Sequence, residues 1–181
     1  TNESVAPPID SAPRAINYFA DYSGCGYWRM IWPEQLLTAY QHVIVQGSTT
    51  MLRDEEIYNN ITCVRLQRQA SPHQLDFYRR LVDLSEKLDF RVIYEIDDLV
   101  LNEDIPDYNK YKFAFVDPKI RSSIVDMMRM SHEITVTCEE MKEYYIRKTG
   151  NTNVTVIPNY APRFWLDHHY DESILSKNYD R

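Results

Sequence analysis

One stretch, EITVTCEEMKEYYIRKTGNTNVTVIP at residues 133–158, constrains the fold more than any other. It opens with a short run of apolar and β-branched residues, which is typical of a sheet with both faces covered. A helix is expected next, capped by Thr137 and ended by Gly150, and a second strand then stops at Pro158. A strand, a helix of about three turns and a strand within some thirty residues predict a βαβ unit, with parallel pairing and a right-handed crossover.

The rest of the chain alternates in the same way. Short apolar runs predict earlier strands at residues 15–19, 42–45, 61–66 and 91–96, with a turn at 47–50. Helical spacing and start signals predict helices at 27–40, divided by Pro33, at 71–88, and from Pro118 onward. Strands that alternate with helices specify a Rossmann-like, three-layer α/β domain with a mostly parallel sheet.

Composition divides the chain into three parts. Residues 1–13 are polar, contain three prolines and show no periodicity, so we expect a flexible leader on the surface. Residues 14–162 carry the alternating pattern and are enough for one well-buried domain. In residues 163–181 the pattern breaks down, and we expect an interdomain or linker segment in a chain that is one part of a longer protein.

Charge and cysteine usage exclude several classes of protein. The net charge of -7 and the isoelectric point near 5.2 argue against a nucleic-acid or membrane-surface binder that works mainly through basic charge. The three cysteines lie far apart without CxxC spacing, so neither a disulfide framework nor a zinc knuckle is indicated, and a reducing, cytoplasmic setting is favoured. No apolar run reaches the roughly 20 residues that span a bilayer.

Two of the four glycines, Gly24 and Gly26, lie in a loop that should leave the carboxyl end of the first strand. Loops at this place in open α/β sheets bind ligands, and glycine lets the backbone approach a ligand closely. A tight turn without a ligand is an equally good interpretation, because Gly-x-Gly alone is weak evidence. The neighbouring aromatic residues could stack on a sugar or a base, but helical spacing favours a place in the core for Tyr22, Tyr27, Trp28 and Trp32.

The acidic set Glu95, Asp97 and Asp98 lies at the end of the predicted strand 91–96, where side chains of α/β sheets face the substrate crevice. Three interpretations remain open. The set could bind a divalent metal, although no further ligands can be named. Asp97 could be a general base for a hydroxyl acceptor. In the third interpretation, one carboxylate caps the following turn and another pairs with an arginine.

Other patterns of nucleophiles and metal ligands are weaker. His168 and His169 are adjacent, so their side chains diverge and do not form a metal pair. Cys25 has no neighbouring base in the sequence that would activate its thiol. The chain lacks a Walker-type loop, and Arg29 interrupts the fuller Gly-x-Gly-x-x-Gly dinucleotide pattern. No residue is therefore assigned as a metal ligand.

Three segments resemble GT-B glycosyltransferases. The run VTCEEMKEYYIRKTGNTNVTVIPNYAP is similar to the end of the amino-terminal domain of that family, where a strand, a short helix and a strand lead to an Ile-Pro-Asn exit. The GCGYWR loop at 24–29 resembles the family's first glycine-containing turn, and YEIDDLV at 94–100 is similar to the strand-end segment of some bacterial and phage members. The resemblance covers most of residues 14–162.

The resemblance implies one half of a GT-B architecture, the amino-terminal half that binds the acceptor. Such an enzyme transfers a sugar, hexosyl or pentosyl, from a nucleotide-sugar donor to a hydroxyl acceptor, which is a glycan, a small molecule or a modified DNA base. The donor would bind a second, carboxyl-terminal domain outside this chain. The chain alone is therefore expected to be inactive and to hold no cofactor, and a role for a divalent metal in the full enzyme stays open.

The same resemblance implies roles for particular residues. Asp97 would be the catalytic residue, or would only orient the acceptor if the enzyme is of the retaining type. Acceptor binding would fall to Gly24, Gly26, Tyr27 and Asp98. Asn159 and Tyr160 would lie at the interdomain exit.

A non-catalytic α/β binding module of receiver or adaptor type is the alternative hypothesis. The same fold and the Asp97–Asp98 pair suggest it, and it predicts a self-sufficient chain that could bind Mg²⁺ at that pair. A metal-dependent GT-A transferase is disfavoured, because the chain is short and has no Asp-x-Asp spacing.

Overall fold

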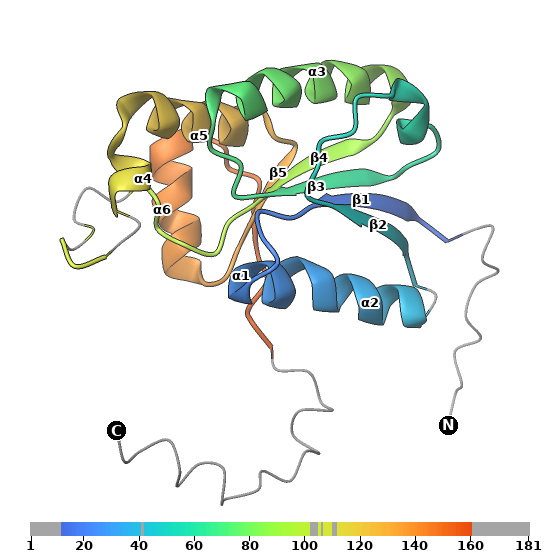
Figure 1. Cartoon of the computed structure of the whole chain (residues 1–181), viewed down its shortest axis with the longest axis horizontal. Helices are drawn as coiled ribbons and strands as arrows, with labels where there is room; N and C mark the ends of the chain where they lie inside the picture. The colour runs from blue at the N-terminus through green and yellow to red at the C-terminus, as the bar shows by residue number, and fades with distance from the viewer. Residues whose placement is uncertain (1–11, 41, 102–104, 106, 110–111, 161–181) are drawn as a thin grey trace, which may run out of the picture.

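The computed structural model describes residues 12–40, 42–101, 105, 107–109 and 112–160. Six strands form one sheet in the order β2-β1-β3-β4-β5-β6, and every neighbouring pair is parallel (Figure 1). The strands are β1 (Arg14–Tyr18), β2 (Ile44–Ser48), β3 (Cys63–Gln67), β4 (Arg91–Glu95), β5 (Glu133–Val136) and β6 (Val154–Val156). The predicted Rossmann-like α/β fold is confirmed, and the sheet is parallel throughout in the part of the chain that the structure describes.

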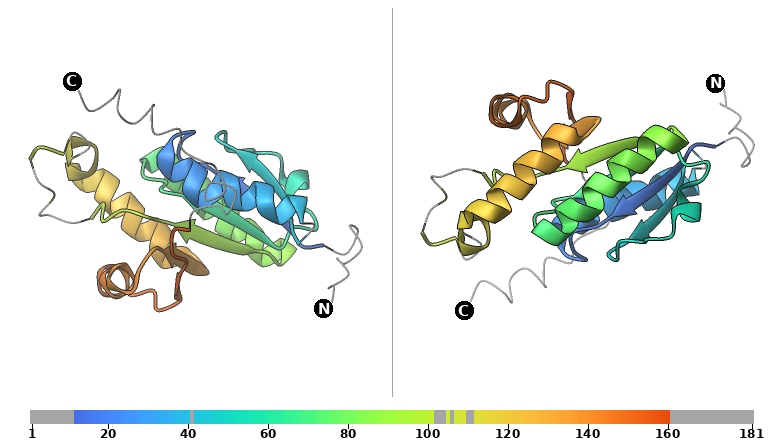
Figure 2. Two further views of the ribbon diagram at one scale, coloured as in Figure 1. Left: turned by 90° about the horizontal axis from the view of Figure 1, so that it is seen from below. Right: turned by 90° about the horizontal axis from the view of Figure 1, so that it is seen from above.

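Helices cover the sheet from both sides and make three layers (Figures 1 and 2). One side carries a continuous helical segment made of α1 (Gly24–Gly26), the π-helical η2 (Tyr27–Ile31) and α2 (Trp32–Ala39). The other side carries α3 (Pro72–Leu88), α5 (Pro118–Met130) and α6 (Glu139–Thr149). Two short elements, η3 (Glu55–Tyr58) and α4 (Lys112–Val116), lie in the connections.

The strand order creates a topological switch point between β1 and β3. The chain leaving β1 runs through α2 to β2 on one side, whereas the chain leaving β3 runs through α3 to β4 on the other. Helices α2 and α3 therefore lie on opposite faces of the sheet (Figure 1). Open α/β sheets bind ligands at the carboxyl ends of the two strands that flank such a point.

The two faces of the sheet differ in chemistry. The face under α3, α5 and α6, here called the apolar face, is made of side chains at most 5% exposed: Ile16, Tyr18, Val64, Leu66, Val92, Tyr94, Ile134, Val136 and Val154. The face toward α1, η2 and α2, here called the polar face, is made of alternate residues that are buried or half-buried: Asn17, Arg65, Gln67, Glu95 and Thr135. Because side chains alternate along a strand, β1, β3, β4 and β5 supply residues to both faces.

Several predicted helix boundaries are confirmed in atomic detail. Ser71 caps α3, with its hydroxyl accepting from the Gln74 N–H while the Gln74 side chain accepts from the Ser71 N–H. Asp117 caps α5, and Pro118 occupies its first turn. Gly150 ends α6 in the left-handed conformation at φ 77°.

Other local predictions were wrong. Cys138, not Thr137, stands at the cap position of α6 and makes no side-chain cap, and the Thr137 hydroxyl donates to Met141 Sδ instead. Gly47 is not in a turn but in β2, where a Cβ would lie 2.1 Å from the Phe19 ring. Gly47 is therefore needed for the packing of Phe19 and does not form a turn.

Pro33 stands where the sequence predicts, in the first turn of a helix that follows a short turn. The short turn is the π-helical η2, the helix is α2, and the helical segment continues from one to the other without a break. Proline has no N–H to give to the carbonyl of Arg29 four residues earlier. That carbonyl accepts a hydrogen bond from Arg65 Nη2 at 3.3 Å, so a strand side chain takes the place of the missing donor.

The ends of the domain also need a correction. Residues 1–11 of the predicted leader lie outside the described part of the chain, but Ala12 is buried and the Pro13 carbonyl accepts from the Ile44 N–H, so the packed structure begins before Arg14. The predicted linker 163–181, with its two histidines, lies outside the described residues. Both faces of β5 are covered, as its apolar sequence predicts. Thr155 on β6 is exposed, so one face of that strand is open to solvent.

No helix in the described ranges is both long enough and apolar enough to cross a bilayer.

Candidate functional site

Charged side chains from three separate loops meet at the carboxyl edge of the sheet, at the switch point. Arg68, directly after β3, joins the loop after β1 to the segment after β4. Its Nη2 lies 2.7 Å from Asp21 Oδ2, and its Nη1 lies 2.8 Å from Asp98 Oδ2. The backbone of Arg68 is left-handed at φ 45°, a strained conformation that costs a non-glycine residue of order 1–3 kcal/mol. Such strain is concentrated at functional sites.

The loop after β1 is folded around Asp21. Its carboxylate accepts from the Ser23 N–H at 2.8 Å, from the Ser23 hydroxyl at 2.7 Å and from the Gly26 N–H at 3.4 Å. Burial by itself would raise the pKa of Asp21, but these hydrogen bonds and the Arg68 guanidinium together lower it. Asp21 is therefore ionised at neutral pH and holds the start of the helical segment in place.

The two glycines of the predicted ligand loop have different environments. A Cβ on Gly26 would lie 1.9 Å from the Asp21 carbonyl oxygen, so glycine is required there by the chain's own loop. A Cβ on Gly24 would meet nothing within 4 Å. Both residues belong to helix α1 rather than to an extended loop. The structure thus gives Gly26 a packing role and leaves acceptor binding at both positions a prediction.

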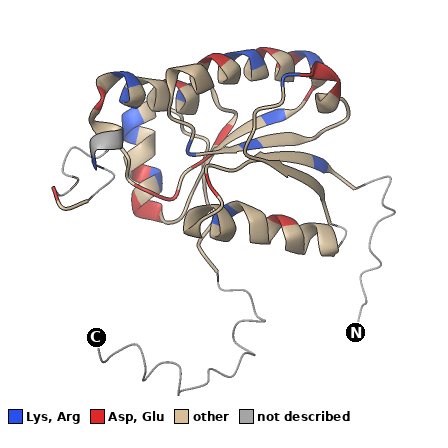
Figure 3. Cartoon of the chain, viewed as in Figure 1, with Lys and Arg blue, Asp and Glu red and all other residues tan. Residues whose placement is uncertain are grey.

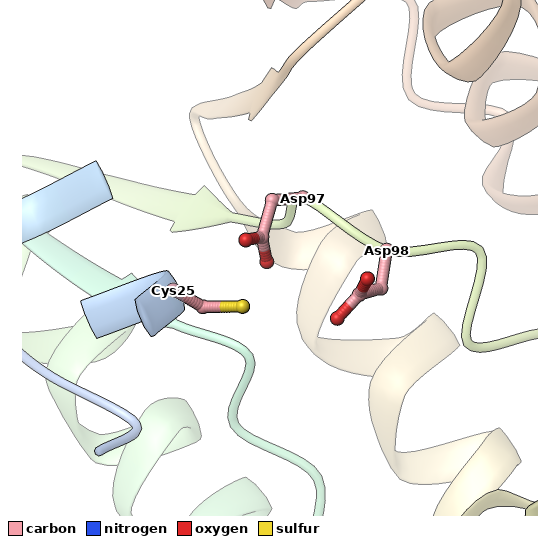
Figure 4. A group of neighbouring side chains, drawn as sticks. All are labelled: Cys25, Asp97 and Asp98. Carbon is pink, nitrogen blue, oxygen red and sulfur yellow. The ribbon is translucent and has the colours of Figure 1, made fainter. Parts of the chain in front are cut away.

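Cys25, Asp97 and Asp98 face one another across this edge (Figure 4), and their ligand atoms lie within 4.8 Å of each other. Burial, the hydrogen bond to Asp97 and the negative charge of both carboxylates raise the pKa of Cys25 to about 11. Burial, followed by the charges of Asp98 and Glu95, raises the pKa of Asp97 against the opposing effects of Cys25 and Arg68. A thiol with so high a pKa is protonated at neutral pH, which argues against a nucleophilic role for Cys25.

Glu95 does not face the crevice as the sequence predicted. It is fully buried on the polar face, under the edge, and it accepts from two arginines. Arg29 Nε lies 2.6 Å from Oε1, and Arg65 Nη2 lies 2.9 Å from Oε2. The Thr135 hydroxyl donates to the same carboxylate. The interpretation in which a carboxylate of this set pairs with an arginine is thus correct for Glu95, and for Asp98 as well.

The predicted interdomain residues lie beside this buried ion cluster. Asn159 Oδ1 accepts from Arg29 Nη1 at 3.1 Å, and the Ile157 carbonyl accepts from the same nitrogen. Tyr160 is 75% exposed at the end of the described chain. The segment after β6 therefore leaves the domain in contact with η2, on the polar face.

The predicted aromatic residues divide between surface and packing. Tyr27 is 39% exposed and packs on Trp32 with ring centroids 5.8 Å apart, and Trp28 meets Trp32 edge-on at 4.8 Å. Tyr22 is 63% exposed and stands edge-on to Phe19. Tyr22 and Tyr27 therefore lie at the surface next to the carboxyl edge, and not in the core as their spacing predicted.

The charge of the carboxyl edge is mostly negative. Asp21, Asp97 and Asp98 supply three carboxyl groups, and Arg68 is the cation that pairs with two of them. Figure 3 shows the acidic residues that end β4 and begin the following segment. A metal ion at Cys25, Asp97 and Asp98 would compete with Arg68 for Asp98, so the geometry does not favour a metal centre.

Sequence reasoning missed the residues that join these loops. Gln67 is fully buried at the end of β3, where its Oε1 accepts from the Ala20 N–H at 3.1 Å and its Nε2 donates to the Cys25 carbonyl at 3.0 Å. Arg29, Arg65 and Arg68 were not assigned any role. The available signal was a charged or amide residue inside a run that is otherwise apolar, as in YWRMI and CVRLQ.

A hollow lies away from the carboxyl edge, between η3 and α3, and shares no residue with that edge. It is lined by Leu52, Arg53, Glu55, Tyr58, Phe77, Arg80, Leu81 and Leu84.

A comparison with models of known protein families gave no match, and neither did comparisons with curated proteins and with solved structures. The chemistry of the edge is therefore the basis on which a function can be argued.

Proposed function

We propose that this chain is the acceptor-binding half of a glycosyltransferase that moves a sugar from a nucleotide-sugar donor to a hydroxyl acceptor. The proposal depends mainly on one observation, the Asp97 carboxyl group at the carboxyl end of β4. Its Oδ1 is buried and has no hydrogen-bond partner among the described residues. An acceptor hydroxyl is a donor of the kind that this oxygen lacks.

Asp97 also has the electrostatics of a general base. A base is most effective when its pKa lies near the working pH, and burial raises the pKa of Asp97 in that direction. In the transfer, the acceptor oxygen would form the new bond to the sugar while its proton passes to Asp97. The nucleotide diphosphate would leave with the electron pair of the broken bond. In a retaining enzyme Asp97 would only orient the hydroxyl.

The surroundings suit a neutral, hydroxyl-rich acceptor better than a phosphorylated one. Asp98, whose side chain is half-exposed, offers further acceptors for hydroxyl groups, and Tyr27 and Tyr22 expose ring surface near it. The nucleotide sugar would bind a second domain, which the segment after Asn159 would join to this one. Asn159 then stands at the interdomain exit, as the family resemblance implies.

The test uses the natural protein that contains this chain and a panel of nucleotide sugars. We expect one donor to raise the melting temperature and to be hydrolysed or transferred. Asp97→Asn should then lower kcat by about 10²–10⁴-fold, the usual contribution of a general base. Asp76→Asn, an equal change of charge on the exposed side of α3, is the matched control. Failure to bind or hydrolyse any nucleotide sugar would refute the proposal.

A non-catalytic binding module with Mg²⁺ at the acid pair is the second candidate. The observation in its favour is that the carboxylates of Asp97 and Asp98 place oxygen ligands, the kind that Mg²⁺ prefers, within 4.8 Å of one another. Titration of the 181-residue chain with Mg²⁺, followed by thermal shift, separates the two hypotheses. This module predicts saturable stabilisation that Asp98→Asn abolishes and that Arg68→Met strengthens, because the arginine no longer competes for Asp98.

A further inference from the structure

We infer that Arg29 is a positioning residue that couples the carboxyl edge to the direction in which the chain leaves the domain. Arg29 is 3% exposed, although its neighbours in the η2 segment are aromatic and apolar. Burying an arginine is costly unless its hydrogen bonds are satisfied. Arg29 satisfies them with groups from two distant parts of the chain, β4 and the segment after β6.

Each partner of Arg29 adjoins a residue of the candidate site. Glu95, held by Nε at 2.6 Å and Nη2 at 3.3 Å, lies two residues before Asp97. Asn159 and the Ile157 carbonyl, held by Nη1, belong to the exit after β6. The Arg29 backbone itself continues the helix that begins at Gly24. One guanidinium therefore joins the helix start, the acidic strand end and the exit.

The backbone of Arg29 is fixed as firmly as its side chain. Arg65 Nη2 donates to the Arg29 carbonyl at 3.3 Å and to Glu95 Oε2 at 2.9 Å, so both arginines and the carboxylate form a closed ring of contacts. Arg29 lies in a π-helical turn, a feature that is frequent at functional sites. A shift of the helix start would move Arg29, and with it the contacts that hold Asn159.

The shape of the side chain explains why an arginine is needed. A guanidinium presents five donors in a rigid, planar fork and can serve a carboxylate and two further acceptors at once. A lysine at this place could keep the charge next to Glu95 but could not reach the exit as well. The predicted consequence is that Arg29→Lys keeps the fold and loses the coupling.

Hydrogen exchange on the 181-residue chain tests the inference without any ligand. Arg29→Lys and Asn159→Ala are compared with Thr155→Ala, an exposed position on the adjoining strand β6. We expect amide exchange to rise in residues 156–160 by about tenfold, the change that the loss of one hydrogen bond to a charged group produces. We expect a smaller rise, about threefold, in residues 21–31, because the helix start loses its tie to the exit.

The outcomes separate coupling from a purely local effect. Faster amide exchange in both residues 156–160 and residues 21–31, in Asn159→Ala and in Arg29→Lys but not in Thr155→Ala, supports the inference. A rise confined to residues 156–160 would overturn it, since the exit would then be released without any effect on the edge. No rise in either segment would also overturn it. Asn159→Ala leaves the Arg29–Glu95 pair in place, so it decides the matter even if Arg29→Lys does not fold.

The rate at which Cys25 reacts with iodoacetamide gives a second readout. Cys25 lies between the helix start and the acid pair. Cys63 begins β3 at the opposite, amino edge of the sheet, and Cys138 is not part of the Cys25–Asp97–Asp98 group, so both serve as internal references. Faster labelling of Cys25 alone in Asn159→Ala, by about threefold, is the expected result. Equal rates in the variant and the wild type would contradict the coupling.

Discussion

The apolar face and the polar face of the sheet are built largely from the same strands, yet different interactions hold each face in place. On the apolar face, residues such as Val64, Tyr94 and Ile134 are almost completely buried under α3, α5 and α6. On the polar face, Glu95 and Arg29 are buried and Arg65 is half-buried, and these side chains are held by hydrogen bonds and ion pairs. The apolar face explains why the domain folds, and the polar face explains how loops far apart in sequence are held at one edge.

The difference has an energetic consequence. Apolar burial is not directional, so an apolar face tolerates small shifts of its helices. A buried ion cluster is directional, and removal of one member leaves uncompensated charges. The polar face is therefore the more sensitive to single substitutions, although it contributes less to net stability when intact.

The largest effect is expected for Glu95→Ala on the polar face. The substitution leaves the buried Arg29 and the half-buried Arg65 without their shared carboxylate, and we expect the free energy of unfolding to fall by about 3–5 kcal/mol. Urea denaturation monitored by circular dichroism measures it. Asp76→Ala on α3 is the control, because both members of its ion pair with Arg79 are solvent-exposed and such a pair is worth less than about 1 kcal/mol. Similar losses for both variants would remove the distinction between a buried cluster and a surface pair.

A slightly smaller effect is expected for Ile134→Ala on the apolar face. Ile134 is completely buried on β5, and the truncation leaves a cavity that should cost about 3 kcal/mol. In the same urea experiment, the exposed Thr155→Ala should stay within about 0.5 kcal/mol of the wild type. Thermal-shift titration of Ile134→Ala with whichever ligand the edge binds should give an unchanged affinity. A loss of affinity as large as that of Asp97→Asn would show that the two faces are not separable.

The fold could be predicted because the residues of the apolar face recur at every second position of the strand sequences. Runs such as CVRLQ and RVIYE place an apolar residue at every second position, and start signals such as Ser71 and Pro118 mark the helices. The errors arose where tertiary contacts decide the local structure. Gly47 belongs to a strand because the Phe19 ring occupies the space that a side chain would need, which is a contact between β2 and the residue after β1.

The site could be predicted only in part. Asp97 and Asp98 were found because a strand end can be read from the sequence. Their partner Arg68 could not be found, since its contact with Asp21 spans 47 residues and depends on β1 and β3 being neighbours. Glu95 was predicted to lie with Asp97 and Asp98, but it is the last residue of β4 and its side chain is buried on the polar face, whereas Asp97 and Asp98 follow the strand in the next segment.

An intermediate effect is expected on the reactivity of Cys25, which reports on charge at the edge. Asp97→Asn removes a negative charge that raises the pKa of this thiol and replaces a charged hydrogen-bond acceptor with a neutral one. The pKa should therefore fall from about 11 toward the ordinary value of 9.0, and alkylation at pH 8 should become up to about tenfold faster. Mass spectrometry of the Cys25 peptide across pH 7–11 measures it, with Cys63 and Cys138 as references. An unchanged rate profile would mean that burial alone controls the thiol.

The smallest effect, and the finest test of the edge, is the opposite pH dependence expected for two of its carboxylates. The pKa of Asp97 is raised, so its ionised form is disfavoured in the folded state and reduces stability at neutral pH, an effect that disappears as the pH falls below the unfolded value of 3.8. The pKa of Asp21 is lowered, so this carboxylate adds stability above 3.8, which is lost as the pH falls through its folded pKa. At pH 7, Asp97→Asn should thus melt slightly higher than the wild type and Asp21→Asn lower, and both differences should shrink toward pH 3. Melting curves between pH 3 and pH 7 measure both. If both variants shift the melting temperature in the same direction, the two carboxylates share one environment. The distinction between Asp21, which holds the loop, and Asp97, which is available to a ligand, would then be wrong.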